Sequence, residues 1–517
     1  MSDSSILIAG AGPSGMTAAI ELKRAGLDVR IIDKSDHMAE YSQALVVQAR
    51  TLEQFQRYGI ADEAVARGRK LYGARFYSEG KKIVSMSFDE LSSRYPFLLF
   101  LPQSETEALL NEHMERLGVK TERRVDLESL AQDRRGVHAR LRHPDGSFEN
   151  LSVRWLIGCD GAHSTVRERT GTPFQGGGVG LSFFVGDLEL DGPDAPKDEL
   201  TVHVHRGDVV FMGRLSDKLV RMIVALHSEQ DKDERRQLTA ADFQQAADHV
   251  GVRVNVRSTA WASPFHVNDR QARAYRIGHV FLAGDASHVH SPVGGQGMNT
   301  GIQDAANVAW KLAAVARGAH PSLLDSYEEE RCEVGKTLLR LTERGLKMAT
   351  ISNPLMEGVR DLLAPLISNL KPVQRALIGF IAETAIEYRS SSIVWDHGGD
   401  GDLRAGDRLP DFTLQDPGDK TTLLRNWTEP RHLALVINGS DAEIAQIRSD
   451  LPEVEVVPLY TPRLDDEGVR LLGIRKKLII VRPDGYVGFR APLANQKERR
   501  AYAQQDGLIP EVVTMAA

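Results

Sequence analysis

Gly284 and Asp285 directly follow the apolar run Val280–Ala283, and a glycine-rich stretch, Gly294–Gly301, comes shortly afterwards. A strand that ends in a carboxylate, beside a glycine-rich loop that opens a helix, is a common way to hold a phosphate-bearing, polyhydroxylated cofactor. The helix is predicted to begin near Asn299, because apolar residues then recur at helical spacing, at Ile302, Ala305, Ala306, Ala309, Leu312, Ala313 and Ala316. The positive end of this helix would stabilise an anionic group by about 0.3–1 kcal/mol.

A second glycine motif, Gly10-Ala-Gly-Pro-Ser-Gly15, fits the G-x-G-x-x-G fingerprint of dinucleotide-binding folds. Gly10 permits a tight turn, Gly12 lets the backbone approach a pyrophosphate, and Gly15 allows close packing of the helix that follows. The motif comes after the apolar run Ser5–Ala9, and a second predicted strand ends in Asp33, 18 positions after Gly15. An acid at about this offset binds a ribose hydroxyl. The alternative, an ordinary glycine-rich turn, does not account for strand, helix and acid together.

Composition narrows the class of protein. The chain has 517 residues, enough for two to four domains, and its formal charge of −7 with 26% charged residues predicts a soluble globular protein. Because there is no basic tract, no secretory signal and no apolar stretch long enough to span a bilayer, we expect a cytoplasmic protein that binds neither nucleic acid nor membrane. Cys159 and Cys332 are the only cysteines. They argue against a disulfide framework, a zinc site and thiol redox chemistry.

The elements that must position the motifs alternate along the chain. Trp155–Arg167 contains a buried strand that ends in Asp160-Gly161, and four strands between residues 181 and 227 predict an antiparallel sheet with one face available for a ligand. Residues 345–390 are expected to be helical. After the glycine-rich linker Gly398–Gly401, strands alternate with helices, and a hairpin is predicted around Pro483-Asp-Gly485.

The order and separation of the Gly10–Gly15, Asp160-Gly161 and Gly284-Asp285 motifs resemble those of the class A flavoprotein aromatic hydroxylases, which share the para-hydroxybenzoate hydroxylase fold. The length and tail resemble the phenol hydroxylase and aromatic polyketide hydroxylase branch. The resemblance implies an α/β protein with a Rossmann-like FAD-binding domain interleaved with a mainly antiparallel β-sheet substrate domain, and a C-terminal thioredoxin-like α/β domain without redox cysteines. We expect the FAD-binding domain in residues 1–72, 104–178 and 276–345, the substrate domain in 73–103 and 179–275, a helical connector in 346–400, and the thioredoxin-like domain in 401–517.

The resemblance also assigns residues to the cofactor. Asp33 is similar to the acid that binds the adenosine ribose, Gln103 to a glutamine near the ribityl chain, and Asp160 to a residue that serves both FAD and the nicotinamide nucleotide. Asp285 resembles the carboxylate that binds the ribityl and pyrophosphate region. The cofactor-binding residues expected on this basis are Gly10, Gly12, Gly15, Asp33, Lys34, Gln43, Gln103, Asp160, Asp285, Gly297, Met298 and Asn299.

The loop beside the flavin's isoalloxazine ring is the part of the resemblance that implies a catalytic role. Pro292, Gly295 and Gly297 occupy that loop. One departure concerns Gln43, which stands where many relatives have arginine. Glutamine carries no charge with which to pair a phosphate or steer the flavin.

The activity implied by the resemblance is that of a monooxygenase. NADPH or NADH reduces FAD, dioxygen forms a C4a-hydroperoxyflavin, and one oxygen is transferred to a small phenolic or polyketide-like aromatic substrate. Two alternatives stay open. The same oxidant supports a Baeyer–Villiger reaction on a ketone, and a non-catalytic flavoprotein could sequester an aromatic ligand. The tail is expected to have a structural role, for which a homodimer is one possibility.

Histidines are the remaining candidates for acid–base chemistry or metal binding. His203 and His205 lie two residues apart and so share a face of a predicted strand. His203 is a candidate substrate-pocket base, but we favour a solvated sheet face because no third metal ligand is evident. His288 and His290 follow Asp285, and that stretch is already explained as a flavin loop. We therefore predict no metal site.

Overall fold

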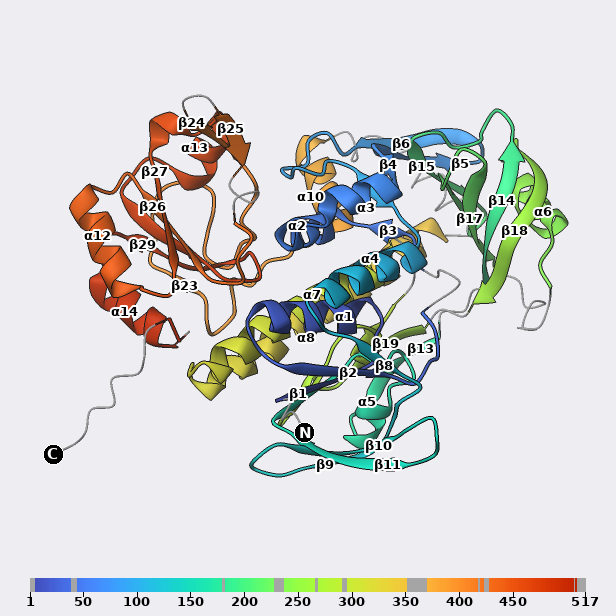
Figure 1. The fold of residues 1–517 in the computed structure, drawn as a ribbon. Coiled ribbons are helices and arrows are strands. Elements are labelled where there is room, and N and C mark those ends of the chain that lie inside the picture. The colour runs from blue at the N-terminus through green and yellow to red at the C-terminus, as the bar shows by residue number, and fades with distance from the viewer. Residues whose placement is uncertain are drawn as a thin grey trace.

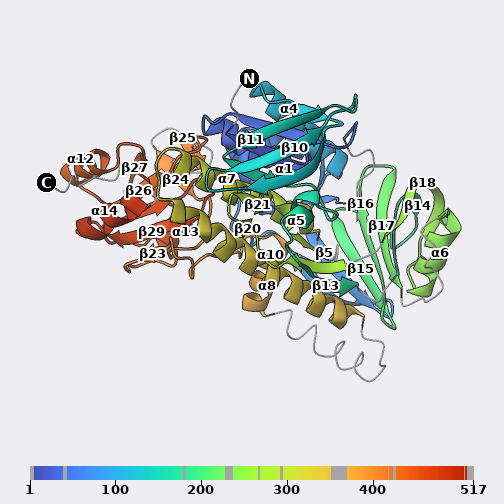
Figure 2. The same ribbon diagram turned by 90° about the horizontal axis from the view of Figure 1, so that it is seen from below.

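The computed structural model describes residues 5–38, 44–178, 182–226, 237–265, 268–290, 295–350, 370–416, 419–422, 427–505 and 507–508. A domain built on a parallel sheet lies at the centre of the molecule, a large mainly antiparallel sheet lies on one side of it, and a C-terminal α/β domain lies on the other (Figures 1 and 2). No described helix is both long and apolar enough to cross a membrane.

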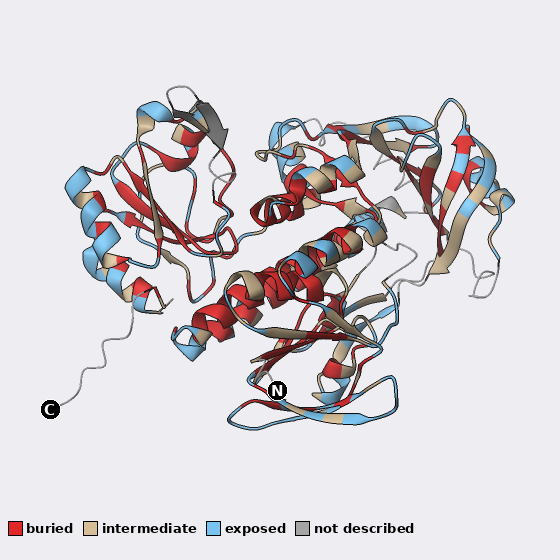
Figure 3. Cartoon of the chain, in the orientation of Figure 1, coloured by how far each residue is buried: buried red, intermediate tan, exposed pale blue. Residues whose placement is uncertain are grey.

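The central domain contains a six-stranded sheet in the order β20-β21-β12-β1-β2-β8. Strand β1 pairs in parallel with both β2 and β12, so its four residues are buried and uniformly apolar. Helices α1, α4 and α7 lie together on one side of this sheet, and helices α1 and α7 are largely buried there (Figure 3). The bounds are β1 (Ile6–Ala9), β2 (Val29–Asp33), β8 (Thr121–Arg123), β12 (Trp155–Gly158), β20 (Arg276–Ile277), β21 (Val280–Leu282), α1 (Pro13–Arg24), α4 (Gln103–Arg116) and α7 (Gly297–Ala316).

The large sheet has seven strands in the order β18-β14-β17-β16-β15-β5-β6. The four strands predicted between residues 181 and 227 are confirmed as β14 to β17, and α6 covers one face, where the Phe243 ring fills the space beside Gly186. Strand β7 does not join this sheet although it lies within 73–103; it pairs with β3 and β4 instead. The bounds are β3 (Val46–Val47), β4 (Arg69–Leu71), β5 (Gly73–Ser78), β6 (Lys81–Ser87), β7 (Leu98–Phe100), β14 (Ser182–Asp191), β15 (Glu199–His205), β16 (Asp208–Arg214), β17 (Leu219–Leu226), α6 (Ala240–His249) and β18 (Asn255–Phe265).

The C-terminal domain has a sheet in the order β23-β29-β28-β26-β27, in which β28 is antiparallel to β26 and β29, while β26 is parallel to β27 and β23 is parallel to β29. This is the thioredoxin-like arrangement expected, and the hairpin predicted around Pro483-Asp-Gly485 joins β28 to β29. The bounds are β23 (Trp395–Asp396), β26 (Leu433–Ile437), α12 (Asp441–Asp450), β27 (Glu455–Leu459), α13 (Asp466–Leu472), β28 (Lys477–Val481), β29 (Val487–Pro492) and α14 (Gln496–Gln505).

The remaining elements connect or extend these domains. Helices α8 and α10 lie between the central and C-terminal domains in sequence, and strands β9 to β11 form a separate antiparallel sheet. The remaining bounds are α2 (Ala49–Tyr58), α3 (Ala61–Arg67), β9 (Asp126–Gln132), β10 (Val137–Arg142), β11 (Phe148–Val153), α5 (Thr165–Arg169), β13 (Phe174–Gly178), β19 (Asn268–Ala272), η1 (Gly284–Ala286), β22 (His288–Val289), η2 (Pro321–Leu324), α8 (Asp325–Ala349), α10 (Lys371–Ile381), β24 (Thr413–Asp416), β25 (Asp419–Thr422) and η3 (Thr461–Arg463).

The hairpin between β28 and β29 docks the C-terminal domain onto the central one through buried charges. Asp484 accepts hydrogen bonds from Asn307 Nδ2 (3.1 Å) and Trp310 Nε1 (3.0 Å) on α7. Arg482 forms a bidentate ion pair with Glu330 on α8, at 2.6 and 3.0 Å. These side chains are almost fully buried, so each charge needs its partner.

Candidate functional site

The loop between β1 and α1 is shaped by its three motif glycines. Gly10 has φ of +98°, and a β-carbon there would overlap the carbonyl oxygen of Cys159. A β-carbon on Gly15 would overlap the carbonyl of Gly10, so the helix can pack this closely only because both are glycine. Gly12, by contrast, has no neighbour within 4 Å of its would-be β-carbon. This open side of the loop leaves room for a phosphate at the N-terminus of α1.

Asp33 at the end of β2 holds the glycine loop in place. Its carboxylate accepts a hydrogen bond from the Ala11 amide at 2.6 Å and another from the Ser35 amide at 2.8 Å. A carboxylate has further lone pairs, so these bonds leave capacity for a ribose hydroxyl. Lys34, next to it, is exposed.

Asp160 lies just beyond β12, adjacent in the sheet to β1. Its carboxylate accepts hydrogen bonds from Ser164 Oγ (2.5 Å) and from the Val166 amide (3.0 Å), which fixes the turn into α5. Burial raises the pKa of Asp160, although these hydrogen bonds oppose the shift. Arg167 connects this turn to the third motif, because its guanidinium donates to the carbonyl oxygens of Ala162 (2.8 Å) and Ala286 (3.0 Å).

The Gly284-Asp285 motif follows β21, the next strand of the sheet, and packs against the first motif. Gly284 has φ of +62°, and Ser14 Oγ and Gly301 occupy the space beside it. A β-carbon on Gly301 would also meet Ser14 Oγ and Gly284. The glycines therefore let α1, α7 and the Asp285 turn meet without side chains between them. The sheet thus brings all three motifs to its carboxyl edge.

Asp285 directly follows Gly284 at this carboxyl edge of the sheet. Its side chain is exposed to solvent, yet the protein around it is dense enough for burial to raise its pKa, with partial opposition from His288. None of the described residues donates a hydrogen bond to its carboxylate. A carboxylate that is accessible, surrounded by protein and without a donor fits the ribityl and ribose hydroxyl groups of FAD.

A buried network behind Asp285 holds the turn against α7. Asp304 on α7 accepts hydrogen bonds from Arg331 Nε (2.6 Å), from the Gly284 amide (3.1 Å) and from His288 Nε2 (2.8 Å) in its NH tautomer. Arg331 continues to Tyr388 Oη at 2.7 Å. His288 therefore has a structural partner.

The N-terminus of α7 is fixed by Asn299. Its side-chain amide donates to the carbonyl oxygens of Val46 (2.7 Å) and Gly295 (2.8 Å), and its oxygen accepts from the Gln48 amide at 2.9 Å. The first backbone amides of the helix, at Gly297 and Met298, begin an unpaired helix end that suits a negative charge. The side chain of Asn299 thus positions this end.

Two of the other predicted residues lie outside the described residues, and a third contacts a residue at the edge of a described range. Gln43 and Pro292 belong to the stretches that the structure leaves undescribed. Gln103 begins α4, where its amide donates to the Ala44 carbonyl oxygen (3.1 Å) and its side chain donates to Glu107 (2.9 Å). Gln103 therefore holds Ala44, which is the described residue closest to Gln43 in sequence.

His203 is not brought together with these motifs. It pairs across β15 and β16 with Val210, so both point toward the face that α6 covers. Its ring stacks on Tyr77 with centroids 4.6 Å apart, and burial lowers its pKa to about 4. His205, two residues on, contacts the ring of His249 at the end of α6.

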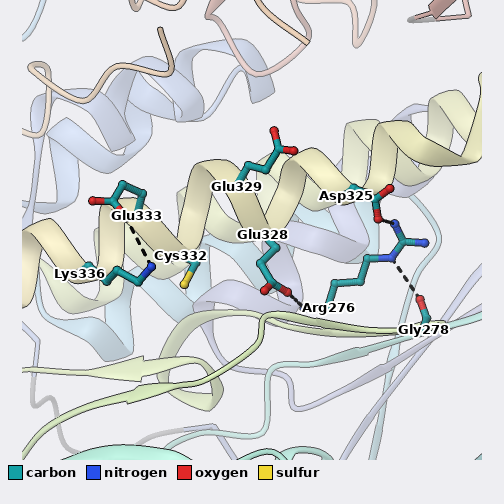
Figure 4. A pocket seen from close by; sticks show the side chains of 8 residues that line it. All are labelled: Arg276, Gly278, Asp325, Glu328, Glu329, Cys332, Glu333 and Lys336. Carbon is teal, nitrogen blue, oxygen red and sulfur yellow. Dashed lines mark hydrogen bonds and ion pairs between the residues drawn. The ribbon is translucent and has the colours of Figure 1, made fainter. Parts of the chain in front are cut away.

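A polar groove of about 680 Å³ lies elsewhere, between α8 and the β20–β21 turn (Figure 4). Arg276 is paired with Asp325 at 2.5 Å, and Glu328 accepts the amides of Tyr275 and Arg276. The lining is predominantly acidic and has no motif residue, so it does not suit an anionic dinucleotide.

Comparisons with known proteins agree with this geometry. Residues 3–342 match the family described as FAD binding domain, and residues 402–506 match the family described as aromatic-ring hydroxylase, C-terminal. 6-Methylpretetramide 4-monooxygenase of Streptomyces rimosus is 35% identical to this chain over 98% of it and 94% of that protein. Pentachlorophenol 4-monooxygenase of Sphingobium chlorophenolicum is 32% identical over 95% and 94%. The anhydrotetracycline hydroxylase OxyS of S. rimosus superposes with a TM-score of 0.80 at 30% identity, covering 97% of this chain and 99% of that one.

Sequence reasoning missed the residues that support the motifs. Asp304 had a signal, because it is a carboxylate within a helix whose residues are mostly small or apolar. Arg331 had none, since it stands in the charged run Glu328–Arg331 that is typical of a solvated helix face. Arg167 was likewise indistinguishable from a surface cation.

Proposed function

The chain belongs to the FAD-dependent aromatic-ring monooxygenases, and we propose that it transfers one oxygen atom from dioxygen to a phenolic or fused polycyclic aromatic substrate, with NADPH or NADH as reductant. The observation that carries the site assignment is the convergence of Gly12, Asp160 and Asp285 at one edge of the parallel sheet, in front of the N-terminus of α7.

Each of these groups has a proposed task. The amides at the start of α1 bind the pyrophosphate, Asp33 binds the adenosine ribose, and Asp285 binds the ribityl chain. When bound and reduced, FAD would supply the electrons that activate dioxygen. The N-terminus of α7 stabilises the negative charge of the reduced ring, because its amides are already oriented and require no rearrangement. Asn299 and the Asp304–Arg331 network keep that helix end in position.

The proposed substrate class rests on relatives whose names specify a pretetramide, an anhydrotetracycline and pentachlorophenol. All three imply a phenolic or polycyclic ring as the reacting group. The substrate is proposed to bind against the face of the seven-stranded sheet that α6 leaves uncovered.

The test is NADPH and NADH oxidation by the FAD-loaded protein across a panel of phenols and fused aromatic rings, with peroxide and product counted separately. A substrate should stimulate oxidation, with little peroxide and a product heavier by one oxygen. Ring hydroxylation and lactone formation have the same mass, so NMR of the product separates them. If no aromatic compound stimulates NADPH or NADH oxidation, the result supports the alternative of a non-catalytic flavoprotein that sequesters an aromatic ligand.

The division into domains also remains a proposal. We assign residues 1–72, 104–178 and 276–345 to FAD, residues 73–103 and 179–275 to the substrate, and residues 401–517 to a structural domain. A homodimer and a cytoplasmic location stay predictions. Light scattering of the purified protein tests the homodimer.

A further inference from the structure

The end of α10 carries a glutamate at a position where helices usually carry glycine. The Glu383 amide donates to the Phe380 carbonyl (3.1 Å) and the Thr384 amide donates to the Gly379 carbonyl (2.9 Å), which is the Schellman pattern of a helix end. Glu383 adopts the left-handed conformation of this turn, with φ of +57°. Glycine fits there at the least cost, because a β-carbon strains a left-handed backbone. A glutamate at this position therefore indicates a task for its side chain.

The side chain of Glu383 reaches the first turns of α7. Its carboxyl group is buried and accepts hydrogen bonds from the Thr300 hydroxyl at 3.0 Å and from the Gln303 side-chain amide. The end of α10 also holds the residue that precedes α7, because Gln296 Nε2 donates to the Phe380 carbonyl at 2.9 Å. These contacts fix the helix end that is proposed to face the reduced flavin ring.

No cation among the described residues donates a hydrogen bond to Glu383. Arg331 on α8 acts on it only at a distance, since its guanidinium donates to other acceptors, which are Asp304, Tyr388 and the Thr300 carbonyl. Burial raises the pKa of Glu383 to about 8, and Asp304 on α7 adds to this shift while Arg331 and the two hydrogen bonds oppose it. A buried carboxylate without a paired cation is costly, so the carboxyl group keeps its proton. The Thr300 hydroxyl can accept that proton as readily as it can donate its own.

Two other arginines lie beside this turn, and both are paired with a different glutamate. The backbone amide of Arg50 on α2 contacts the residue before Glu383, and the side chain of Arg408 contacts the residue after it. Both guanidinium groups bind Glu53, at 3.0 and 2.7 Å. Their charges are therefore already compensated.

We propose that Glu383 is a positioning residue for the flavin: as a neutral acid it holds the first turns of α7 and keeps negative charge away from the helix end that stabilises the reduced ring. This rests on the function proposed for that helix end. A carboxylate at the same place would offset part of the positive charge of the helix end and make reduction of the flavin less favourable. By linkage, reduction of the flavin and ionisation of Glu383 oppose each other by the same factor.

The experiment measures the two-electron midpoint potential of the FAD-loaded full chain at pH 6.5 and pH 9, by equilibration with reference dyes and without aromatic substrate. These values lie on either side of the pH at which Glu383 ionises, about 8. Glu383→Gln keeps a neutral group of the same size and is compared with wild type at each pH, so that protonation of the flavin itself affects both alike. The two potentials should coincide at pH 6.5. At pH 9 reduction should be about tenfold more favourable in the variant, a difference of about 30 mV.

Glu383→Gly tests the contacts with α7. Glycine suits the backbone of the turn but has no side chain to hold the helix, so reduction at pH 6.5 should be at least about threefold less favourable than in wild type. Because glycine cannot ionise either, its potential relative to wild type should also rise by about 30 mV between pH 6.5 and 9, which keeps the test valid if Glu383→Gln does not fold. The control is Glu387→Gln, at an exposed acid paired with Arg389 at 3.2 Å, which should follow wild type at both pH values.

Three results would overturn the inference. The first is a more than threefold difference between wild type and Glu383→Gln at pH 6.5, the second is a less than threefold difference between them at pH 9, and the third is a potential of Glu383→Gly that equals that of wild type at pH 6.5. Loss of aromatic hydroxylation with all potentials as expected counts against the proposed function alone.

Discussion

Two aspartates in the same corner of the central domain behave differently. Burial alone would raise the pKa of Asp304, but Arg331 and His288 outweigh it and hold the pKa below its ordinary value. Burial raises the pKa of Asp285, and the nearby His288 opposes this shift only in part. The first carboxylate is satisfied within the protein and the second is not. At the scale of single residues, this difference distinguishes Asp304, which has a structural role, from Asp285, which can bind a ligand.

Asp285→Ala is therefore expected to weaken FAD binding by about 10- to 100-fold, because hydrogen bonds to a charged group contribute about 1.5–3 kcal/mol. The measurement is a titration of the apoprotein with FAD, followed by flavin fluorescence. Asp62→Ala, at an exposed position on α3, is the matched control and should bind FAD like wild type. If both variants bound FAD with equal affinity, the result would show that Asp285 does not contribute to FAD binding.

At the scale of elements, the N-terminal half of α7 is held from outside the central sheet by the end of α10. Glu383 is fully buried and accepts hydrogen bonds from Thr300 (3.0 Å) and Gln303 on α7. Gln296 Nε2 donates to the Phe380 carbonyl at 2.9 Å. Burial raises the pKa of Glu383 to about 8, against the opposing effect of its hydrogen bonds and of Arg331. The glutamate is therefore neutral in the folded protein at pH 7.

This predicts a specific pH dependence. An unfolded glutamate titrates near pH 4.3, so between that value and about pH 8 the folded protein keeps a proton that the unfolded chain releases. The contribution to stability is complete below this window and is lost as the pH rises through it. Glu383→Gln removes the titration, so the free energy of unfolding of wild type should fall relative to this variant by about 2–4 kcal/mol between pH 5 and 8.

Urea unfolding at several pH values measures that difference. Glu387→Gln, at an exposed neighbour paired with Arg389, is the control and should unfold in parallel with wild type. A Glu383→Gln curve that also runs parallel to wild type would show that the glutamate is already ionised.

At the scale of the whole molecule, the C-terminal domain is joined to the flavin-site helix by the hairpin tip. Asp484 contacts Asn307 and Trp310 on α7, while Lys311 on the same helix donates to Glu330 at 2.8 Å. Burial lowers the pKa of Lys311 to about 8, partly offset by Glu330. The domain has no cysteine, so it cannot carry out thiol redox chemistry. Its contacts with α7 and α8 support the structural role proposed for it.

Asp484→Ala should destabilise the protein by about 3–5 kcal/mol, because it leaves part of a buried charge network without its partner. The urea midpoint and the rate of proteolytic release of the C-terminal domain report the effect. Asp402→Ala breaks an exposed ion pair with Arg470 (2.7 Å) in the same domain and should cost less than about 1 kcal/mol. If the two variants lost similar amounts of unfolding free energy, the result would contradict a docking role for the hairpin.

Local sequence patterns predicted many helices and turns, because these elements depend mainly on residues that are close in sequence. The period of apolar residues located α7 to within two residues of its start. The Pro-Asp-Gly turn placed the hairpin at 483–485, because its residues favour the backbone angles that a tight turn needs. The pairing of β7 with β3 and β4 was not predictable, since strand pairing depends on register and on contacts between distant segments.

The family, the cofactor and the three motifs could be predicted from the sequence, because glycines and acids at strand ends carry their chemistry in their local spacing. Which charges are partners depends on the tertiary fold. Arg331 and Asp304 lie 27 positions apart, Arg221 and Asp187 lie 34 apart, and Arg482 and Glu330 lie 152 apart. A charged residue has the same appearance in a sequence whether it is solvated or buried. Folding alone removes the water and makes the partner necessary.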